Sequence, residues 1–221
     1  LIERRKKGEP VAYLINEKAF WKNVFYVDKD VLIPRPDTEL LIEKILKIYS
    51  NKSQLQILDI GTGSGCIILS LLKERKKDYG TGIDISKKSI NVSKINAKLL
   101  NLSNRTKFFH SSIDNFNIGK YDLIVSNPPY IELLNLKYLE KDVVNFEPKL
   151  ALNGGLDGFS KIKTVIFKAS SLIKKKGKLI LEIGFNQKDK VKEMLKKQGF
   201  YVNHTFQDHG NNDRCIISTK I

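Results

Sequence analysis

Four residues, Asn127-Pro128-Pro129-Tyr130, follow directly after the apolar run 123–126, and their atoms suit the alkylation of a flat, weakly nucleophilic nitrogen. Two consecutive prolines fix the backbone and remove two N–H donors, so the turn is rigid and presents carbonyl acceptors. The side-chain oxygen of Asn127 and the carbonyl of Pro128 can accept both hydrogens of a substrate –NH2 group, while the ring of Tyr130 stacks on the planar group. The turn therefore predicts methylation of an amide or amino nitrogen; the alternative is a plain turn that ends a strand.

A glycine loop lies upstream of this turn, between an apolar strand-like run at 55–60 and an apolar helical stretch that begins at Cys66. Glycines allow positive φ and a close approach of the backbone to a ligand, and N–H groups at a helix start point toward whatever the loop holds. The predicted cofactor-binding residues of this loop are Gly61, Thr62, Gly63, Ser64 and Gly65.

A carboxylate ends the next strand-like run, Gly80 to Ile83. This residue, Asp84, lies about 20 residues beyond the glycine loop, where a carboxylate can bind both hydroxyls of a ribose. The dinucleotide fingerprint would place its third glycine or alanine at position 66, but the chain has Cys66 there and its glycine at 65. The resulting G-x-G-x-G spacing favours S-adenosylmethionine, which has no pyrophosphate, over NAD.

The chain resembles the HemK-type protein-(glutamine-N5) methyltransferases over nearly its whole length. The asparagine-proline-proline-tyrosine turn alone is shared with adenine-N6 methyltransferases, whereas the segments Pro34 to Glu39 and Phe146 to Leu152 narrow the family. The segments that carry the resemblance are Gly8 to Leu14, Phe20-Trp21, Leu32 to Glu39, the glycine loop, Asn127 to Ile131 and Phe146-Glu147-Pro148 leading to Ala151-Leu152.

The resemblance implies a function. Members of this family use S-adenosyl-L-methionine, leaving S-adenosyl-L-homocysteine, to methylate the glutamine of the Gly-Gly-Gln loop in class-I peptide chain release factors. We therefore expect Asn127, Pro128 and Tyr130 to be catalytic, with Pro129 completing the substrate-binding turn. We also expect Asn127, besides Asp84 and the glycine loop, to contact the cofactor.

The adenine contact is harder to place. After the strand-like run near 107–109, relatives often carry an acidic residue followed by an aromatic one, but Ser111-Ser112 occupy these positions here. We expect Ser112 to contact the cofactor, and Asp114 is the nearest carboxylate.

Two other enzymatic functions stay open. An adenine-N6 DNA or RNA methyltransferase would use the same turn on a flipped base, although no segment with interleaved aromatic and basic residues stands out as a target-recognition region. A glutamine methyltransferase of a ribosomal protein would differ little in sequence from a release-factor enzyme. The non-enzymatic alternative is a cofactor-binding scaffold that has lost activity.

The order of elements predicts a doubly wound, mostly parallel sheet of the class-I methyltransferase (Rossmann-like) type, with an antiparallel C-terminal hairpin. We expect residues 1–34 to be the remnant of an N-terminal substrate-binding region plus a β-hairpin linker, and 35–221 to be the methyltransferase domain. The hairpin is expected between Phe20 and Ile33, around 28–30, and Lys174 to Gly177 is interpreted as a helix C-terminus with a glycine stop. Expected strands lie near 55–60, 80–84, 106–109, 121–126, 178–183, 200–206 and 213–219, and expected helices open at Pro36 and lie near 65–76, 86–100, 159–174 and 187–198.

Two acidic side chains allow two interpretations each. Asp59, at the end of the first strand of the sheet, either orders the glycine loop or is a simple turn residue. Glu147 either lines the substrate pocket or braces a loop through a salt bridge.

Composition limits the partners. The net charge is +15, but most of the 39 basic residues are lysines, so we expect a solvated lysine face and no stable nucleic-acid binding. Cys66 and Cys215 read as reduced core residues of a cytoplasmic protein, and the three histidines lack metal-ligand spacing. No apolar run approaches the roughly 20 residues of a membrane span.

Two further expectations concern the whole molecule. We expect a monomer. Because the chain begins at Leu1 without a methionine, we expect it to be a fragment of a longer protein.

Overall fold

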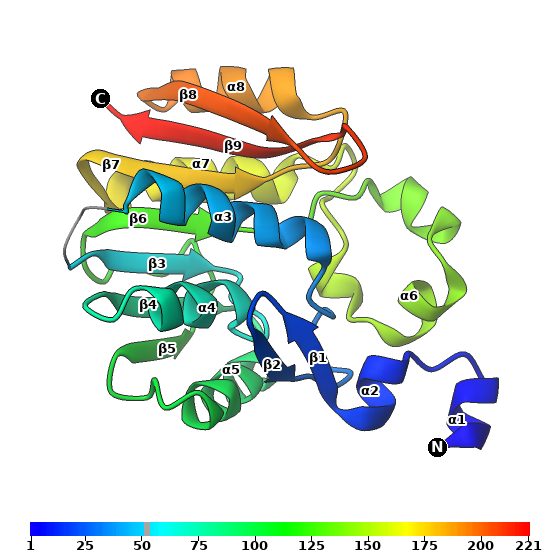
Figure 1. Cartoon of the computed structure of the whole chain (residues 1–221). Helices are drawn as coiled ribbons and strands as arrows, with labels where there is room; N and C mark the ends of the chain where they lie inside the picture. The colour runs from blue at the N-terminus through cyan, green and yellow to red at the C-terminus, as the bar shows by residue number, and fades with distance from the viewer. Residues whose placement is uncertain (51–53) are drawn as a thin grey trace.

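The computed structural model describes residues 1–50 and 54–221. A seven-stranded sheet in the order β5-β4-β3-β6-β7-β9-β8 forms its centre, and a two-stranded sheet, β1-β2, lies beside it near the N-terminus (Figure 1). The strands are β1 Glu17–Phe20, β2 Asn23–Tyr26, β3 Gln56–Ile60, β4 Tyr79–Asp84, β5 Thr106–His110, β6 Tyr121–Ser126, β7 Ile173–Glu182, β8 Phe200–Gln207 and β9 Asp213–Lys220. The α-helices are α1 Ile2–Lys6, α2 Val11–Ile15, α3 Glu39–Ile48, α4 Cys66–Glu74, α5 Lys87–Leu99, α6 Lys141–Phe146, α7 Ser160–Leu172 and α8 Lys188–Lys197, with 3-10 helices η1 Pro36–Thr38, η2 Leu133–Tyr138 and η3 Lys149–Ala151.

The central sheet is parallel except at one end. Strands β5, β4, β3, β6 and β7 pair in parallel, and β9 pairs antiparallel with both β7 and β8. This arrangement confirms the predicted class-I methyltransferase fold, including its antiparallel C-terminal hairpin.

The central strands are apolar at successive positions because both faces of the sheet are covered. Ile57 and Leu123 pack on the face that holds α3 and α4, whereas their neighbours Leu58 and Ile124 pack on the face that holds α7 and α8. Alternate residues of a strand point to opposite faces, so a strand buried on both sides reads as a continuous apolar run.

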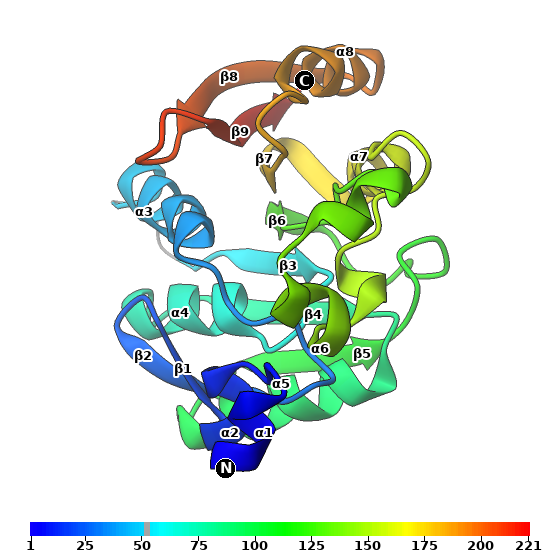
Figure 2. The ribbon, with the colours of Figure 1, turned by 90° about the vertical axis from the view of Figure 1, so that its right-hand side faces the viewer.

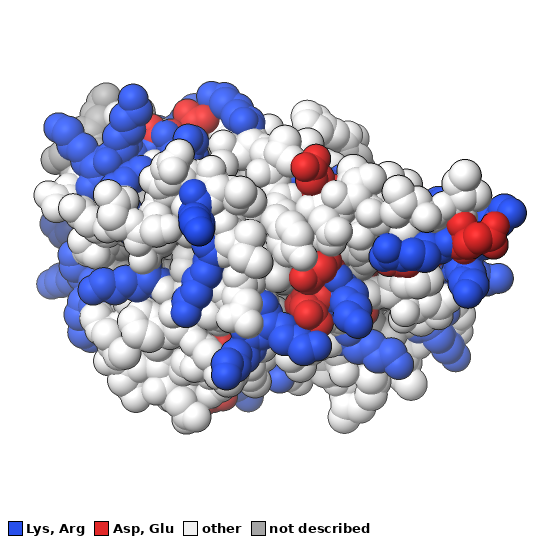
Figure 3. Space-filling view, turned by 90° about the horizontal axis from the view of Figure 1, so that it is seen from below, with Lys and Arg blue, Asp and Glu red and all other residues white. Residues whose placement is uncertain are grey.

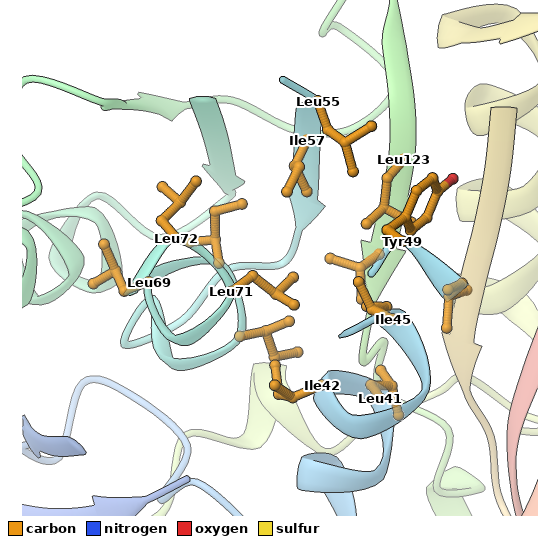
Figure 4. Packing of buried hydrophobic residues seen from close by; sticks show 14 of the residues in the cluster. Leu41, Ile42, Ile45, Tyr49, Leu55, Ile57, Leu69, Leu71, Leu72 and Leu123 are labelled. Atoms are coloured by element: carbon orange, nitrogen blue, oxygen red, sulfur yellow. The ribbon is translucent and has the colours of Figure 1, made fainter. Parts of the chain in front are cut away.

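Helices α3 and α4 cover one face with complementary apolar stripes. Figure 4 shows Ile45 of α3 and Leu71 of α4 gathered around Ile57 and Leu123 of the sheet. These four side chains are fully buried. Burial of this kind stabilises a fold by roughly 25 cal/mol per Å² of apolar surface removed from water. The packing fixes the segment before α3, which reaches the site described below.

The strand order reverses between β3 and β6. From β3 the chain proceeds through β4 to β5 on one side, and it then returns to place β6 and β7 on the other. Ligands of open α/β sheets bind beyond the carboxyl ends of the strands at such a reversal. Figure 2 looks toward this edge, where the segment that contains α6 lies in front of the sheet.

The N-terminal hairpin is confirmed, but it lies earlier in the chain than the sequence predicted. Its strands pair Phe20 with Asn23 around a two-residue turn, Trp21-Lys22, and Trp21 has φ 53°. Bulky residues rarely adopt positive φ, so Trp21-Lys22 is not recognisable as a turn from the sequence. Residues 28–31, where we expected the hairpin, form a turn in which Asp28 Oδ1 accepts a hydrogen bond from the Asp30 N–H at 2.9 Å.

The interpretation of Lys174 to Gly177 as a helix end was wrong. Helix α7 ends at Leu172, and Ile173 is already extended, with φ −83° and ψ 143°. The four residues form an irregular start of β7, where the register shifts between Tyr121 and Leu123 of the neighbouring strand. Lys174 Nζ pairs with Asp122 Oδ2 at 2.9 Å, so a cation that resembled a helix cap instead binds the adjacent strand.

Charged side chains are dispersed on the face that carries the hairpin and α5. Figure 3 shows lysine and arginine side chains separated by uncharged surface, with acidic side chains among them. Among the residues that the structure describes, no helix has the length and apolar character needed to cross a bilayer.

Candidate active site

A cavity of about 320 Å³ lies at the carboxyl ends of β3, β4 and β6, where the strand order reverses. Its volume falls within the range of about 300–1,000 Å³ that is typical of small-molecule sites. The glycine loop and the asparagine-proline-proline turn both line this cavity, although 60 or more residues separate them in the chain. The structure therefore brings the two sequence motifs together.

Two glycines of the loop face the cavity. Gly61 has φ +73° and Gly63 has φ +55°, and a Cβ added to either would meet no atom within 4 Å. Both residues line the cavity. A side chain at these positions would be strained and would occupy space that a ligand can use.

The other predicted loop residues do not line the cavity but hold the loop. The Thr62 hydroxyl donates to Asp59 Oδ2 at 2.8 Å, and the Ser64 carbonyl accepts from Asn96 Nδ2 at 2.8 Å. Gly65 precedes α4, and a Cβ there would lie 3.0 Å from the Leu69 side chain. These residues fix the backbone from which Gly61 and Gly63 face the ligand space.

Asp59 orders the glycine loop, as one of the two interpretations proposed. It is fully buried, and burial raises the pKa of its carboxyl to about 7, although the hydrogen bond from Thr62 opposes the shift. Its Oδ1 has no partner among the described residues. Ionisation of a buried carboxyl that lacks a hydrogen-bond partner at one oxygen costs free energy.

Asp84 braces the loop and also faces the cavity. Its Oδ2 accepts from the Gly63 N–H at 3.0 Å and its Oδ1 accepts from the Ser86 N–H at 2.8 Å. Burial raises the pKa of Asp84, and these two N–H donors oppose the rise. Each carboxylate oxygen can accept a further hydrogen bond, so the exposed side of Asp84 fits a ribose diol.

The loop after β5 supplies the wall where we expected the adenine contact. Ser112 and Asp114 both line the cavity, together with Ser111 and Ile113. The structure thus places the predicted residue and its nearest carboxylate at the same wall.

The asparagine-proline-proline turn forms the wall beyond β6. Asn127, Pro128 and Pro129 line the cavity, whereas Tyr130 does not. The partly buried Tyr130 ring packs against the apolar cluster under α7 and α8. Its hydroxyl donates to Glu182 Oε1 at 3.3 Å and accepts from Arg214 Nη1 at 3.4 Å. Burial, followed by the charge of Glu182, raises the pKa of Tyr130, so its hydroxyl stays protonated.

Asn127 is held by a residue that sequence reasoning did not single out. Its Nδ2 donates to Thr38 Oγ1 at 3.1 Å, and the Thr38 hydroxyl donates to Glu182 Oε2 at 2.7 Å. Thr38 belongs to the family segment Pro34 to Glu39, and Glu182 is a charged residue that ends an apolar strand. Both features were visible in the sequence, but the 144 residues between these two positions hid their contact.

Glu147 braces a loop and does not line the cavity. Its Oε1 accepts from Arg35 Nη2 at 2.5 Å, and its Oε2 accepts from the Ile33 N–H at 3.2 Å. Burial raises the pKa of Glu147, and the Arg35 guanidinium opposes the rise. This pair secures the chain just after Lys29 to Leu32, which line the cavity and were not predicted.

Helix α7 supplies a further wall that the sequence did not reveal. Lys161, Thr164 and Val165 line the cavity from its first turns. Among residues 1–50 and 54–221, no group of three His, Cys, Asp or Glu side chains is placed to hold a metal ion. Both cysteines are free thiols.

Comparisons with known proteins agree with this geometry. Residues 35–145 match the family described as "Methyltransferase small domain". The chain is 40% identical to the release factor glutamine methyltransferase of Buchnera aphidicola subsp. Baizongia pistaciae, over 100% of this chain and 79% of that protein. It is 36% identical to the enzyme of the same name from Caulobacter vibrioides, over 99% of this chain and 76% of that protein.

A solved structure supports the fold. The crystal structure of a methyltransferase from Pyrococcus furiosus superimposes with a TM-score of 0.67 at 19% sequence identity, and the match covers 98% of both chains.

Proposed function

The chain belongs to the release factor glutamine methyltransferases, and from this we propose that it methylates the side-chain amide nitrogen (N5) of the glutamine in the Gly-Gly-Gln motif of class-I peptide chain release factors. The observation that carries the proposal is the position of Asn127 on the wall of the cavity that Gly61, Gly63 and Asp84 also line. An amide-binding turn and a nucleoside-binding wall thus share one space.

S-adenosyl-L-methionine is the methyl donor of this family, and the residues present fit it. When bound, it supplies an electrophilic methyl group, and S-adenosyl-L-homocysteine is the product. Gly61 and Gly63 leave room for the ligand, and Asp84 offers acceptors to the ribose hydroxyls. Ser112 is the proposed contact to the adenine side, and Asn127 the proposed contact near the reacting group.

The chain's own residues must overcome the weak nucleophilicity of an amide nitrogen, whose lone pair is shared with its carbonyl. Asn127 Oδ1 and the Pro128 carbonyl accept hydrogen bonds from the two N–H groups of the substrate amide. These hydrogen bonds favour a more pyramidal nitrogen with a freer lone pair. The turn also orients this nitrogen, and orientation can recover roughly 7–11 kcal/mol of a barrier. No strong base is required before the attack, because the nitrogen becomes acidic only as the new bond forms; the proton that it then releases passes to solvent water.

The remaining residues of the turn complete the substrate site. Pro129 lines the cavity beside Pro128, whereas Tyr130 does not. In place of the expected stacking on the substrate amide, we assign Tyr130 to brace the turn through its hydroxyl, which bonds to Glu182 and Arg214. Lys29 to Leu32 also line the cavity, so the segment 1–34 contributes to the site as well as preceding the domain at 35–221. The proposal includes a monomer that acts in the cytoplasm, where release factors work.

Transfer of a labelled methyl group tests the function. Purified protein is incubated with labelled S-adenosyl-L-methionine and, separately, with each of five substrates: a class-I release factor, its Gln→Ala variant in the Gly-Gly-Gln motif, a ribosomal protein, adenine-containing DNA and adenine-containing RNA. Label on the release factor that disappears in the variant supports the proposal. Label on ribosomal protein or nucleic acid alone would overturn the proposed substrate.

A further inference from the structure

A chain of hydrogen bonds leads from the reacting wall of the cavity to a buried carboxylate. Asn127 Nδ2 lies 3.1 Å from Thr38 Oγ1, and Thr38 Oγ1 lies 2.7 Å from Glu182 Oε2. Thr38 is 3% exposed and Glu182 is 1% exposed. The three residues come from η1 and from the carboxyl ends of β6 and β7, so the contact exists only in the folded protein.

The chemistry of these groups determines which atom donates and which accepts in each of these hydrogen bonds. A carboxylate only accepts hydrogen bonds, so the single hydroxyl proton of Thr38 is donated to Glu182. Thr38 Oγ1 can then only accept from Asn127, which turns the –NH2 of the Asn127 amide toward Thr38. Asn127 Oδ1, the other polar atom of the amide, can then accept a hydrogen bond from a ligand in the cavity.

The same carboxylate holds the neighbouring residue of the turn. The Tyr130 hydroxyl donates to Glu182 Oε1 at 3.3 Å, and Arg214 Nη1 donates to the Tyr130 oxygen at 3.4 Å. Arg214 is in turn fixed by Asp208 Oδ2 at 3.0 Å. Two residues of the Asn127 to Tyr130 turn are thus oriented by one buried group.

We infer that Thr38 and Glu182 are positioning residues for methyl transfer: they fix the Asn127 amide with its oxygen toward the substrate –NH2 and hold Tyr130 beside it. The inference rests on the proposed function, because it concerns the amide-binding role of Asn127. A reversed amide would present two donors to a substrate –NH2, which is itself a donor, and binding of the reacting nitrogen would be lost.

The surroundings of Glu182 make the orientation of the Asn127 amide depend on pH. Burial raises its pKa to about 7, while Thr38, Arg214 and Tyr130 lower it and the charge of Asp37 raises it. From β9, Cys215 pairs with Glu182 across the sheet. Below about pH 7 a protonated Glu182 can donate to Thr38, which frees the Thr38 proton to point at Asn127 and reverses the amide. The turnover rate is therefore expected to fall on the acid side of this pKa.

A matched pair of variants at one position tests the inference. Thr38→Val keeps the shape but removes the hydroxyl, whereas Thr38→Ser keeps the hydroxyl. Loss of one buried hydrogen-bond partner typically costs a factor of about 10 to 100, so Thr38→Val should lower kcat by that factor without changing the affinity for S-adenosyl-L-homocysteine. Thr38→Ser should restore most of kcat.

A double-mutant cycle separates positioning from a general structural effect. If Thr38 acts through Asn127, Thr38→Val should cause no further loss of kcat in the Asn127→Ala background. A further loss as large as in the wild-type background would overturn the inference. In Glu182→Gln the acid limb assigned to Glu182 should be absent from the pH profile of kcat; an unchanged acid limb would contradict the pH dependence.

Neutron diffraction of the deuterated protein provides a readout that does not depend on activity. The inference requires a deuterium of Thr38 between Oγ1 and Glu182 Oε2 above pH 7, and two deuterium atoms on the Asn127 atom that faces Thr38. The opposite arrangement would overturn it even if the enzyme methylates release factors. An inactive wild-type protein with the expected deuterium positions would overturn the proposed function and leave the inferred orientation intact.

Discussion

Asp84 Oδ2 accepts a hydrogen bond from the Gly63 N–H at 3.0 Å, so the carboxylate that ends β4 holds the loop that follows β3. The Ser86 N–H occupies Oδ1 at 2.8 Å. Because Asp84 also lines the cavity, one side chain shapes the loop and contacts the ligand space. The affinity for the cofactor should therefore depend on this residue in two ways.

We expect Asp84→Asn to weaken binding of S-adenosyl-L-homocysteine by about 10- to 100-fold, because one oxygen acceptor becomes a donor and hydrogen bonds to a charged group are lost. Isothermal titration calorimetry measures the change. Asp157→Asn, at an exposed turn that pairs with Lys190, is the control and should keep the wild-type affinity. An affinity in Asp84→Asn equal to that of the control would exclude the assigned role.

Removal of the Asn127 amide should separate catalysis from cofactor binding. Asn127→Ala deletes the acceptor assigned to the substrate –NH2, and loss of one preorganised group in an active site costs about 10²- to 10³-fold in kcat. The affinity for S-adenosyl-L-homocysteine should fall by a far smaller factor than kcat, since Gly61, Gly63 and Asp84 remain. Steady-state kinetics with a release factor, together with calorimetry, provide both values. Parallel losses in kcat and cofactor affinity would contradict the assigned role of Asn127.

Much of the fold could be predicted from the sequence because the strands are buried on both faces and read as apolar runs between helical stretches. The site residues at the ends of those runs could be predicted for the same reason: Asp84 ends a strand, Gly61 and Asn127 each follow one, and the three strand ends lie at the same edge. The hairpin turn could not be placed, because Trp21 has a positive φ without a turn-forming side chain.

The contacts of the site were harder to predict than its location. Thr38 and Glu182 meet only through the packing of α3 on the sheet. Their spacing along the sequence contains no information about this contact. The same holds for Lys161 and Thr164, which resemble ordinary surface residues of an amphipathic helix but line the cavity.

The pair of Arg35 and Glu147 should matter for stability. Glu147 is buried, and Arg35→Met would leave its carboxylate without a cation. Breaking a buried ion pair costs about 3–5 kcal/mol, and because Arg35 is partly exposed to solvent we expect about 1–3 kcal/mol here. Urea denaturation measures the free energy of unfolding. Arg35→Lys keeps a cation but not the guanidinium geometry, so its free energy of unfolding should fall by less than that of Arg35→Met.

The stability deficit of Arg35→Met should also depend on pH. The pKa of Glu147 is already raised by burial, and without Arg35 it should rise further. A carboxyl whose pKa is raised by folding contributes stability below its unfolded pKa and loses that contribution as the pH rises through the folded pKa. The deficit should thus be larger at neutral pH than near pH 4. A deficit that is constant between these pH values would show that the Glu147 charge is not its source.

Asp59 offers the clearest test of how the buried carboxylates affect stability. Its pKa is raised from 3.8 to about 7 by burial. Because the protonated form is favoured in the folded state, the contribution of Asp59 to stability is fully present below its unfolded pKa and is lost as the pH rises from about 4 to 7. Asp59→Asn cannot ionise, and its Oδ1 can still accept from the Thr62 hydroxyl.

The free energy of unfolding of Asp59→Asn should therefore fall less than that of the wild type between about pH 4 and pH 7. Urea denaturation at several pH values across this range measures both curves. Thr62→Val serves as the matched comparison, because it removes the hydroxyl that opposes the pKa shift and should extend the decline to higher pH. If Asp59→Asn and the wild type lose stability in parallel across the range, the carboxyl of Asp59 has an ordinary pKa, and the order of the glycine loop does not depend on its protonation.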